Sequence, residues 1–225
     1  MALSFDGTND KVDFGDIATV DGDKLTVCLW YTPTNTNALG LLWGKVAAVG
    51  GDANDLRLQH DDGAGGSGSG ISWIHGTTSP RAVVATGVFT GGTTYHVALV
   101  YDGSLAAANR VVIYLDGVAQ TLTITGTIPT TIVGSADTVT IGAAGDDTLD
   151  LAGTLSHLKV YDEALTQAEV LQEMNAQRVF RTADLYQWSP LDDGTSARDY
   201  SGSGNHGTVT GATQTAGPPV TYGGA

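Results

Sequence analysis

The sequence predicts an all-β protein, folded as a two-sheet antiparallel sandwich with one short helix near residues 166–176. Two features of its composition support this class. Asp outnumbers Glu by 21 to 3, and 31 of the 225 residues are Gly. Asp and Gly favour tight turns, whereas Glu favours helices. The third observation is a series of about a dozen short apolar runs separated by Gly- or Asp-rich turns, which is typical of a sandwich.

The first predicted strands differ in how much of their surface is expected to be buried. Residues 26–31 are apolar on both faces apart from Thr26, so they belong in the middle of a sheet. Residues 55–60 alternate between apolar and polar side chains, so one face of that strand is expected to contact solvent. Residues 95–101 have the same apolar character as 26–31 and are again expected to be buried.

A hairpin is predicted at Asp116 and Gly117, because a type I′ turn requires a positive φ at both central residues. The turn joins residues 111–115 to a second run that continues through Leu122 and Ile124. Two further strands are predicted later in the chain, at residues 139–141 and 155–161.

The one predicted helix begins with a capping box formed by Thr166 and Glu169. Residues at helical spacing follow it, namely Ala168, Val170, Leu171 and Met174. Two other segments are expected to lack regular structure. Residues 63–70 are a low-complexity Gly/Ser run that predicts a flexible loop, and residues 216–225 predict an extended tail.

Charge and composition exclude several function classes. The net charge of −14 argues against nucleic acid and anionic membranes as partners. No apolar run approaches the roughly 18 residues that a membrane span requires. The single cysteine, Cys28, cannot form an intrachain disulfide framework. The start at Met1 shows no secretory signal, so a leaderless protein is expected.

Five segments in a fixed order carry a family resemblance: residues 2–12, 25–31, 95–103, 112–117 and 158–165. Together they resemble the laminin-G-like domains of bacteria and phages, which have the concanavalin A-like jelly-roll fold. The resemblance implies an all-β jelly-roll sandwich. It also implies a single domain over residues 1–215, followed by the tail.

The order of the segments departs from the family in one respect. Residues 186–207 also resemble the family, in which such a segment usually precedes the Phe-Asp-Gly strand, but here they come last. Residues 185–213 are therefore expected to complete the sandwich, either in their own chain or in a neighbour. A short connector, residues 178–184, favours closure within the chain. Such closure would place Asp199 beside Asp6.

The resemblance also implies a calcium site. Ca²⁺ binds six to eight oxygens from carboxylates, carbonyls and hydroxyls, and a Gly-rich loop with Asp, Ser and Asn can supply them. The alternative is that Asp6 and Asp199 simply cap turns. The predicted metal ligands are Asp6, Asp10, Asp199, Ser201, Asn205 and His206.

Catalysis is not expected. A glycoside hydrolase needs a pair of carboxylates flanking the scissile bond, and no Glu lies on a predicted strand. Asp146, Asp147 and Asp150 cluster, but within a turn, where charged residues are usually solvated. The five histidines are dispersed and lack the spacing of a zinc site.

Two functions remain for a non-enzymatic domain of this kind. The first is a structural or capsid-decoration protein of a bacterial virus, located in the virion, whose partners are other virion proteins or further copies of itself. The leaderless start, the acidic charge and the resemblance of residues 185–213 to phage structural proteins favour it. The alternative is a calcium-supported lectin or adhesin module that binds cell-surface glycans outside the cell. Fold alone does not separate these two functions.

Overall fold

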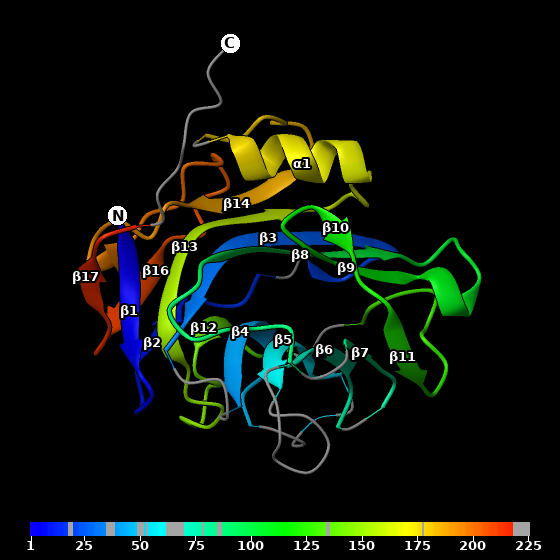
Figure 1. The fold of residues 1–225 in the computed structure, drawn as a ribbon, viewed down its shortest axis with the longest axis horizontal. Helices are drawn as coiled ribbons and strands as arrows, with labels where there is room; N and C mark the ends of the chain where they lie inside the picture. The colour runs from blue at the N-terminus through cyan, green and yellow to red at the C-terminus, as the bar shows by residue number, and fades with distance from the viewer. Residues whose placement is uncertain are drawn as a thin grey trace.

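The computed structural model describes residues 1–17, 20–34, 39–48, 52, 54–61, 70–77, 79–84, 87–133, 136–176 and 178–217. These residues form two antiparallel β-sheets that face one another, with a helix over the outer side of one sheet (Figure 1). The all-β sandwich predicted from the sequence is therefore confirmed. Of the predicted loop at 63–70, residues 63–69 lie outside the described residues and Gly70 begins a strand; of the predicted tail at 216–225, residues 218–225 lie outside them.

The first sheet follows one strand order across the molecule, and β14 (Leu185–Ser189) joins it by pairing with β13. The order is β10 (Val118–Ala119), β9 (Val111–Leu115), β8 (Tyr95–Asp102), β3 (Lys24–Pro33), β13 (Ala152–Tyr161), β1 (Ala2–Asp6) and β17 (Thr213–Thr215).

The second sheet lies opposite the first and contains nine of the described strands. Its order is β11 (Leu122–Thr125), β7 (Arg81–Val84), β6 (Gly70–His75), β5 (Leu56–Asp61), β4 (Gly40–Lys45), β12 (Val139–Gly142), β2 (Lys11–Asp13), β16 (Gly207–Thr210) and β15 (Ser196–Ala197).

The main core lies between the sheets and is built by strand alternation. On β3, Leu25, Val27, Leu29 and Tyr31 point into it and are fully or almost fully buried. The other face of the same strand is covered as well, because Cys28 belongs to a second apolar cluster that includes Val170 of α1 (Gln167–Asn175). This confirms that the strand is buried on both faces, as its apolar run predicts.

The helix α1 begins where the capping box predicts. The Thr166 hydroxyl accepts a hydrogen bond from the Glu169 backbone N–H, and Glu169 Oε2 accepts one from the Thr166 N–H at 2.8 Å. The helix lies over the first sheet, on the side away from the second sheet (Figure 1). Within the described ranges, no helix has the length and apolar character needed to cross a bilayer.

A buried ion pair fixes α1 to the sheet. Lys159 Nζ, on β13, lies 2.7 Å from Glu173 Oε2, and the two side chains are 2% and 0% exposed. The ammonium also donates to the backbone oxygens of Glu173, Ala176 and Arg178 at 2.9 to 3.4 Å. Glu173 Oε1 accepts the N–H groups of Phe180 and Arg181. The pair therefore holds both the helix and the start of the connector.

Two details of the strands differ from the sequence prediction. Asp116 and Gly117 do adopt positive φ values, 49° and 75°, as the hairpin requires. The second strand of that hairpin, however, ends at Ala119, and the chain then crosses to the other sheet to form β11. The prediction that one face of residues 55–60 contacts solvent is also wrong. Arg57 and Gln59 are 4% and 5% exposed, and Arg57 Nε donates to Gln59 Oε1.

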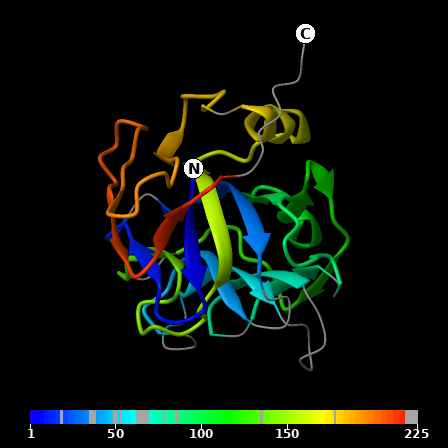
Figure 2. The same ribbon diagram turned by 60° about the vertical axis from the view of Figure 1, so that its left-hand side comes forward.

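The C-terminal segment contributes strands to both sheets of its own chain. β14 pairs with β13, and β17 pairs with β1, joining Leu3 to Gln214. β16 pairs with β2 in the other sheet. Figure 2 shows the red β17 beside the blue β1, so the two ends of the described chain meet at one side of the sandwich.

Candidate functional site

The predicted calcium ligands near the N-terminus lie in the turn between β1 and β2. Asp10 Oδ2 accepts the Asp6 backbone N–H at 2.8 Å, and Asp6 Oδ1 accepts the Thr8 N–H at 2.8 Å. Asp10 is 8% exposed, and its burial raises its pKa above the usual value. The hydrogen bond from Asp6 opposes that rise, whereas the charges of Asp6 and Asp150 add to it. The structure therefore brings Asp6 and Asp10 together as a turn motif.

The carboxylate of Asp199 organises a second turn. Its Oδ1 accepts the backbone N–H groups of Trp188 at 3.0 Å and Ser201 at 2.9 Å. Its Oδ2 accepts the Asn205 N–H at 3.0 Å and lies 2.8 Å from the Ser201 hydroxyl. Each oxygen therefore has two hydrogen-bond partners, which fills the roughly four lone-pair positions of a carboxylate.

Asn205 and His206 complete the same turn. The Asn205 side-chain amide donates to the Tyr186 backbone oxygen at 2.9 Å. His206 Nδ1 accepts the Asp199 backbone N–H at 3.0 Å. The structure thus brings four predicted ligands together, Asp199, Ser201, Asn205 and His206, and binds them to one another and to the chain.

The two turns lie at opposite ends of the ladder between β2 and β16. Lys11 pairs with Thr210 and Asp13 with Thr208, so Asp10 is near Gly211 at one end, while the Asp199 turn precedes Gly207 at the other. Four strand residues span roughly 13 Å. Closure within the chain therefore does not place Asp199 beside Asp6. In the described part of the chain, no group of three or more His, Cys, Asp or Glu side chains is arranged to hold a metal ion.

As folded, the six residues do not form one Ca²⁺ site, because they lie in two separate turns, and an ion at the second turn would have to displace the hydrogen bonds that Asp199 already accepts. We expect the melting temperature of metal-stripped protein to be the same in EDTA and in millimolar Ca²⁺. A ligand that binds only the folded state raises the melting temperature. A clear rise with Ca²⁺, absent in the Asp199→Asn variant, would show that the turn rearranges to take the ion.

The outer face of the second sheet carries a polar hollow, here called the β2–β16 groove. Its volume is about 540 Å³. The buried Val12 points inward, so alternation turns Lys11 and Asp13 outward beside Thr210 and Thr208. The residues lining the groove are Lys11, Asp13, Phe14, Gly15, Thr138, His206, Thr208 and Thr210.

The groove presents both donors and acceptors to solvent. Asp13 Oδ1 accepts the Gly15 N–H at 2.8 Å, and its Oδ2 has no hydrogen-bond partner among the described residues. Because His206 Nδ1 accepts a backbone N–H, the proton of the neutral ring is on Nε2, which is then a donor. Three threonine hydroxyls can act in either role. Lys11 Nζ is held 2.5 Å from Asp147 Oδ1.

Close packing beneath the groove explains one glycine. A Cβ at Gly207 would lie 2.5 Å from Val12 Cγ1 and 2.6 Å from Phe14 Cε1. Any larger residue would push β16 away from β2. Gly207 therefore lets the two strands pair directly over the core, which sets the width of the groove floor.

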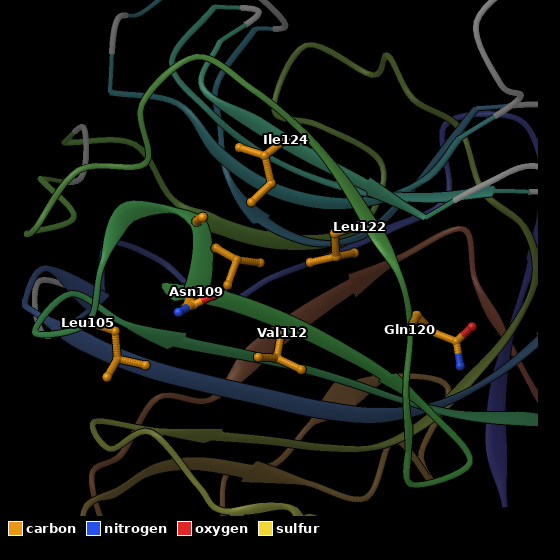
Figure 3. A pocket seen from close by; sticks show the side chains of 8 residues that line it. Leu105, Asn109, Val112, Gln120, Leu122 and Ile124 are labelled. Carbon is orange, nitrogen blue, oxygen red and sulfur yellow. The ribbon is translucent and has the colours of Figure 1, made fainter.

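A second hollow, of about 430 Å³, lies where β9 and β11 border the open side of the sandwich (Figure 3). Leu122 and Ile124 line one side, and Leu105 and Val112 line the other. Most of its lining is apolar, and its polar side chains are Asn109 and Gln120. It offers no charged group, so the β2–β16 groove is the better candidate for a polar ligand.

Sequence reasoning missed most of the groove. Of its residues, only His206 belongs to the predicted site. The available signal was the alternation around Val12 and Val209, which places Lys11, Asp13 and Thr208 on outward faces. That signal does not show that the two strands are neighbours, because nearly 200 residues separate them.

Comparison with known proteins places the chain in a family. A model described as the concanavalin A-like lectin/glucanase superfamily, for laminin-G-type domains, matches residues 6–171. The chain belongs to this superfamily. The predicted laminin-G-like resemblance and its jelly-roll fold are thereby confirmed. No curated protein matches the chain.

Solved structures of this superfamily fold resemble the chain at low identity. A Bacteroides ovatus ATCC 8483 protein named for carbohydrate binding is 19% identical to this chain, with a TM-score of 0.73. The match covers 98% of this chain and 61% of that one. The chain thus spans less than two thirds of that protein. A heptameric SAP-like pentraxin from Limulus polyphemus is 20% identical with a TM-score of 0.59, covering 80% and 83%.

A third similar structure is the CBM40 of the Ruminococcus gnavus IT-sialidase, solved with α2,3-sialyllactose. It is 17% identical with a TM-score of 0.55, and the match covers 76% of this chain and 94% of that one. At such identities the likeness establishes the shared jelly-roll fold. The ligand named for each structure belongs to that protein.

Proposed function

We propose that this superfamily domain is a non-catalytic carbohydrate-binding module that holds a saccharide in the β2–β16 groove. The observation that carries the proposal is the groove itself. It combines a carboxylate, an imidazole N–H and three hydroxyls on one outward sheet face. Sugar hydroxyls both donate and accept hydrogen bonds, so such a mixed lining suits them.

The positions of the glutamates support a binding role over hydrolysis. Glu173 is buried against Lys159, Glu169 closes the capping box, and Glu163 lies 2.7 Å from Lys24. All three are held in or beside α1, which lies over the outer side of the first sheet (Figure 1), whereas β2 and β16 belong to the second sheet. No glutamate is therefore placed to act with Asp13 as the carboxylate pair of a glycosidase.

The similar structures support the second of the two functions that the sequence left open. Two of the three named above are described by carbohydrate binding, and none is described as a virion component. We therefore favour a glycan partner and an extracellular or cell-surface location over a capsid role. In this proposal the module spans residues 1–215, with 185–213 completing the sandwich.

Binding can be tested on a panel of immobilised oligosaccharides, followed by calorimetry with the sugar that binds. Asp13→Asn retains the oxygen that accepts the Gly15 N–H but removes the charge offered to a sugar hydroxyl. We expect its affinity to fall about tenfold or more, since a hydrogen bond to a charged group is worth roughly 1.5–3 kcal/mol.

Asp102→Asn is the matched control. Asp102 Oδ1 accepts the Ser104 N–H at 3.0 Å, two residues on, as Asp13 does for Gly15, but it lies on the first sheet. It should bind like the parent protein. Equal losses in both variants, or unaltered binding in Asp13→Asn, would place the saccharide elsewhere.

A further inference from the structure

The pairing of basic residues singles out Arg198. The chain has ten Lys and Arg side chains against 24 acidic ones, and all ten lie in described residues. Six of the ten form salt bridges: Lys11, Lys24, Lys45, Arg57, Lys159 and Arg181. Arg110 donates to the backbone oxygens of Gly103, Leu105 and Ile128.

Three arginines remain without a salt bridge or a side-chain hydrogen bond in the described part of the chain: Arg81, Arg178 and Arg198. Of these, Arg198 lines a hollow. This hollow of about 330 Å³, here called the Arg198 hollow, is lined by Ser196, Arg198 and His206. Arg198 therefore offers a guanidinium with no salt bridge among the described residues, beside a hollow whose lining includes no carboxylate.

The local backbone explains why these side chains converge. Ala197 is 1% exposed and points into the core, so its neighbours Ser196 and Arg198 point outward. Ser196 on β15 pairs with Thr208 on β16, and Thr208 follows His206 by two residues. Because His206 Nδ1 is occupied by the Asp199 N–H, its Nε2–H is the group available to a ligand. The three side chains thus offer a guanidinium, an imidazole N–H and a hydroxyl.

A carboxylate that interacts electrostatically with Arg198, that of Asp193, already has hydrogen-bond partners of its own. Asp193 Oδ1 accepts the Thr195 N–H at 2.8 Å and the Thr195 hydroxyl at 2.7 Å. These bonds lower the pKa of Asp193, and the charge of Arg198 adds to the effect. Yet Asp193 and Arg198 form no salt bridge within 4 Å among the described residues. Within the described chain, no carboxylate therefore occupies the guanidinium of Arg198 by direct contact.

We propose that the Arg198 hollow binds the anionic group, a carboxylate or a sulfate ester, of an acidic saccharide whose neutral part lies in the β2–β16 groove. His206 lines both hollows, so one ligand can reach from one to the other. Planar or tetrahedral oxyanions match the guanidinium fork, and charge-assisted hydrogen bonds to it are about twice as strong as neutral ones. The proposal deepens the proposed function by naming the ligand class.

The first test uses sulfate and acetate alone, so that it does not depend on finding the sugar. In NMR titrations of the whole protein, each anion should shift the side-chain resonances of Arg198 and His206 saturably. The effect should weaken as NaCl is raised, because salt screens exposed charges. It should disappear in Arg198→Gln and persist in Arg178→Gln, which removes another unpaired, exposed arginine. Shifts equal in both variants, or none in the parent, would overturn the anion site.

The second test compares galacturonate oligosaccharides and galactose 6-sulfate with neutral galactose oligosaccharides. The parent protein should prefer at least one acidic form by roughly tenfold or more, and Arg198→Gln should remove that preference while leaving neutral binding unchanged. The carboxylate and sulfate arms identify the anion. If neutral saccharides bind in a way that depends on Asp13, but acidic saccharides are not preferred through Arg198, this inference is refuted and the proposed function stands. Anion binding at Arg198 without saccharide binding would refute the proposed function and reduce the hollow to a simple anion site.

Discussion

Replacing Lys159 by Met is expected to lower the free energy of unfolding by about 3–5 kcal/mol, because it leaves the buried Glu173 carboxylate without its counter-charge. Glu173 is 0% exposed and cannot regain water without moving α1. Urea denaturation followed by tryptophan fluorescence measures the change. A second variant, Lys159→Met with Glu173→Gln, should recover most of the loss, since Gln still accepts the N–H groups of Phe180 and Arg181.

Lys24→Met provides the matched control. Its partner Glu163 lies at the surface, where the side chains are 36% and 28% exposed. An exposed pair of this kind contributes roughly 0–1 kcal/mol. If Lys159→Met were no more destabilising than Lys24→Met, the ion pair would not be what holds the helix to the sheet.

A chain that ends at Ala176 is expected to lose cooperative folding altogether. It lacks β14, β15, β16 and β17, so β1, β2 and part of β13 lose a ladder partner. It also lacks Leu191 and Ala197 of the main core. A typical domain is stable by only about 5–15 kcal/mol, which such losses exceed. Thermal melts and gel filtration of the shortened chain should show an unfolded or aggregated protein.

Adding residues 178–217 as a separate peptide provides the converse experiment. The peptide contains every missing strand, so it should restore a sharp melting transition at a one-to-one ratio. A shortened chain that stays monomeric and melts like the parent would show that the last strands are not needed for the sandwich.

The sequence predicted those parts of the fold whose cause is local. The capping box at Thr166 and Glu169 defines the helix start through hydrogen bonds within four residues. The turn at Asp116 and Gly117 likewise follows from the φ values that it requires. The crossing after Ala119 could not be predicted, because the run through Leu122 and Ile124 has the same alternation whichever sheet receives it.

The candidate site was harder to predict, for two physical reasons. The oxygens of Asp199 and Ser201 that suit a cation also suit backbone N–H groups, so a calcium loop and a hydrogen-bonded turn have the same composition. The groove depends on the pairing of Asp13 with Thr208, which is a property of the topology. Nor does the alternation at Arg57 and Gln59 show that both faces of β5 are buried.

The ladder between β1 and β17 has a consequence for folding kinetics. It joins Leu3 to Gln214, more than 200 positions apart. The entropy of closing so long a loop grows only with the logarithm of its length, so equilibrium stability suffers little. Folding rates, in contrast, fall as contacts become more distant in sequence. On the ribosome, β1 and β2 must wait for strands that emerge about 200 residues later. Until then the nascent chain carries open sheet edges, and it is in that interval that aggregation competes with folding.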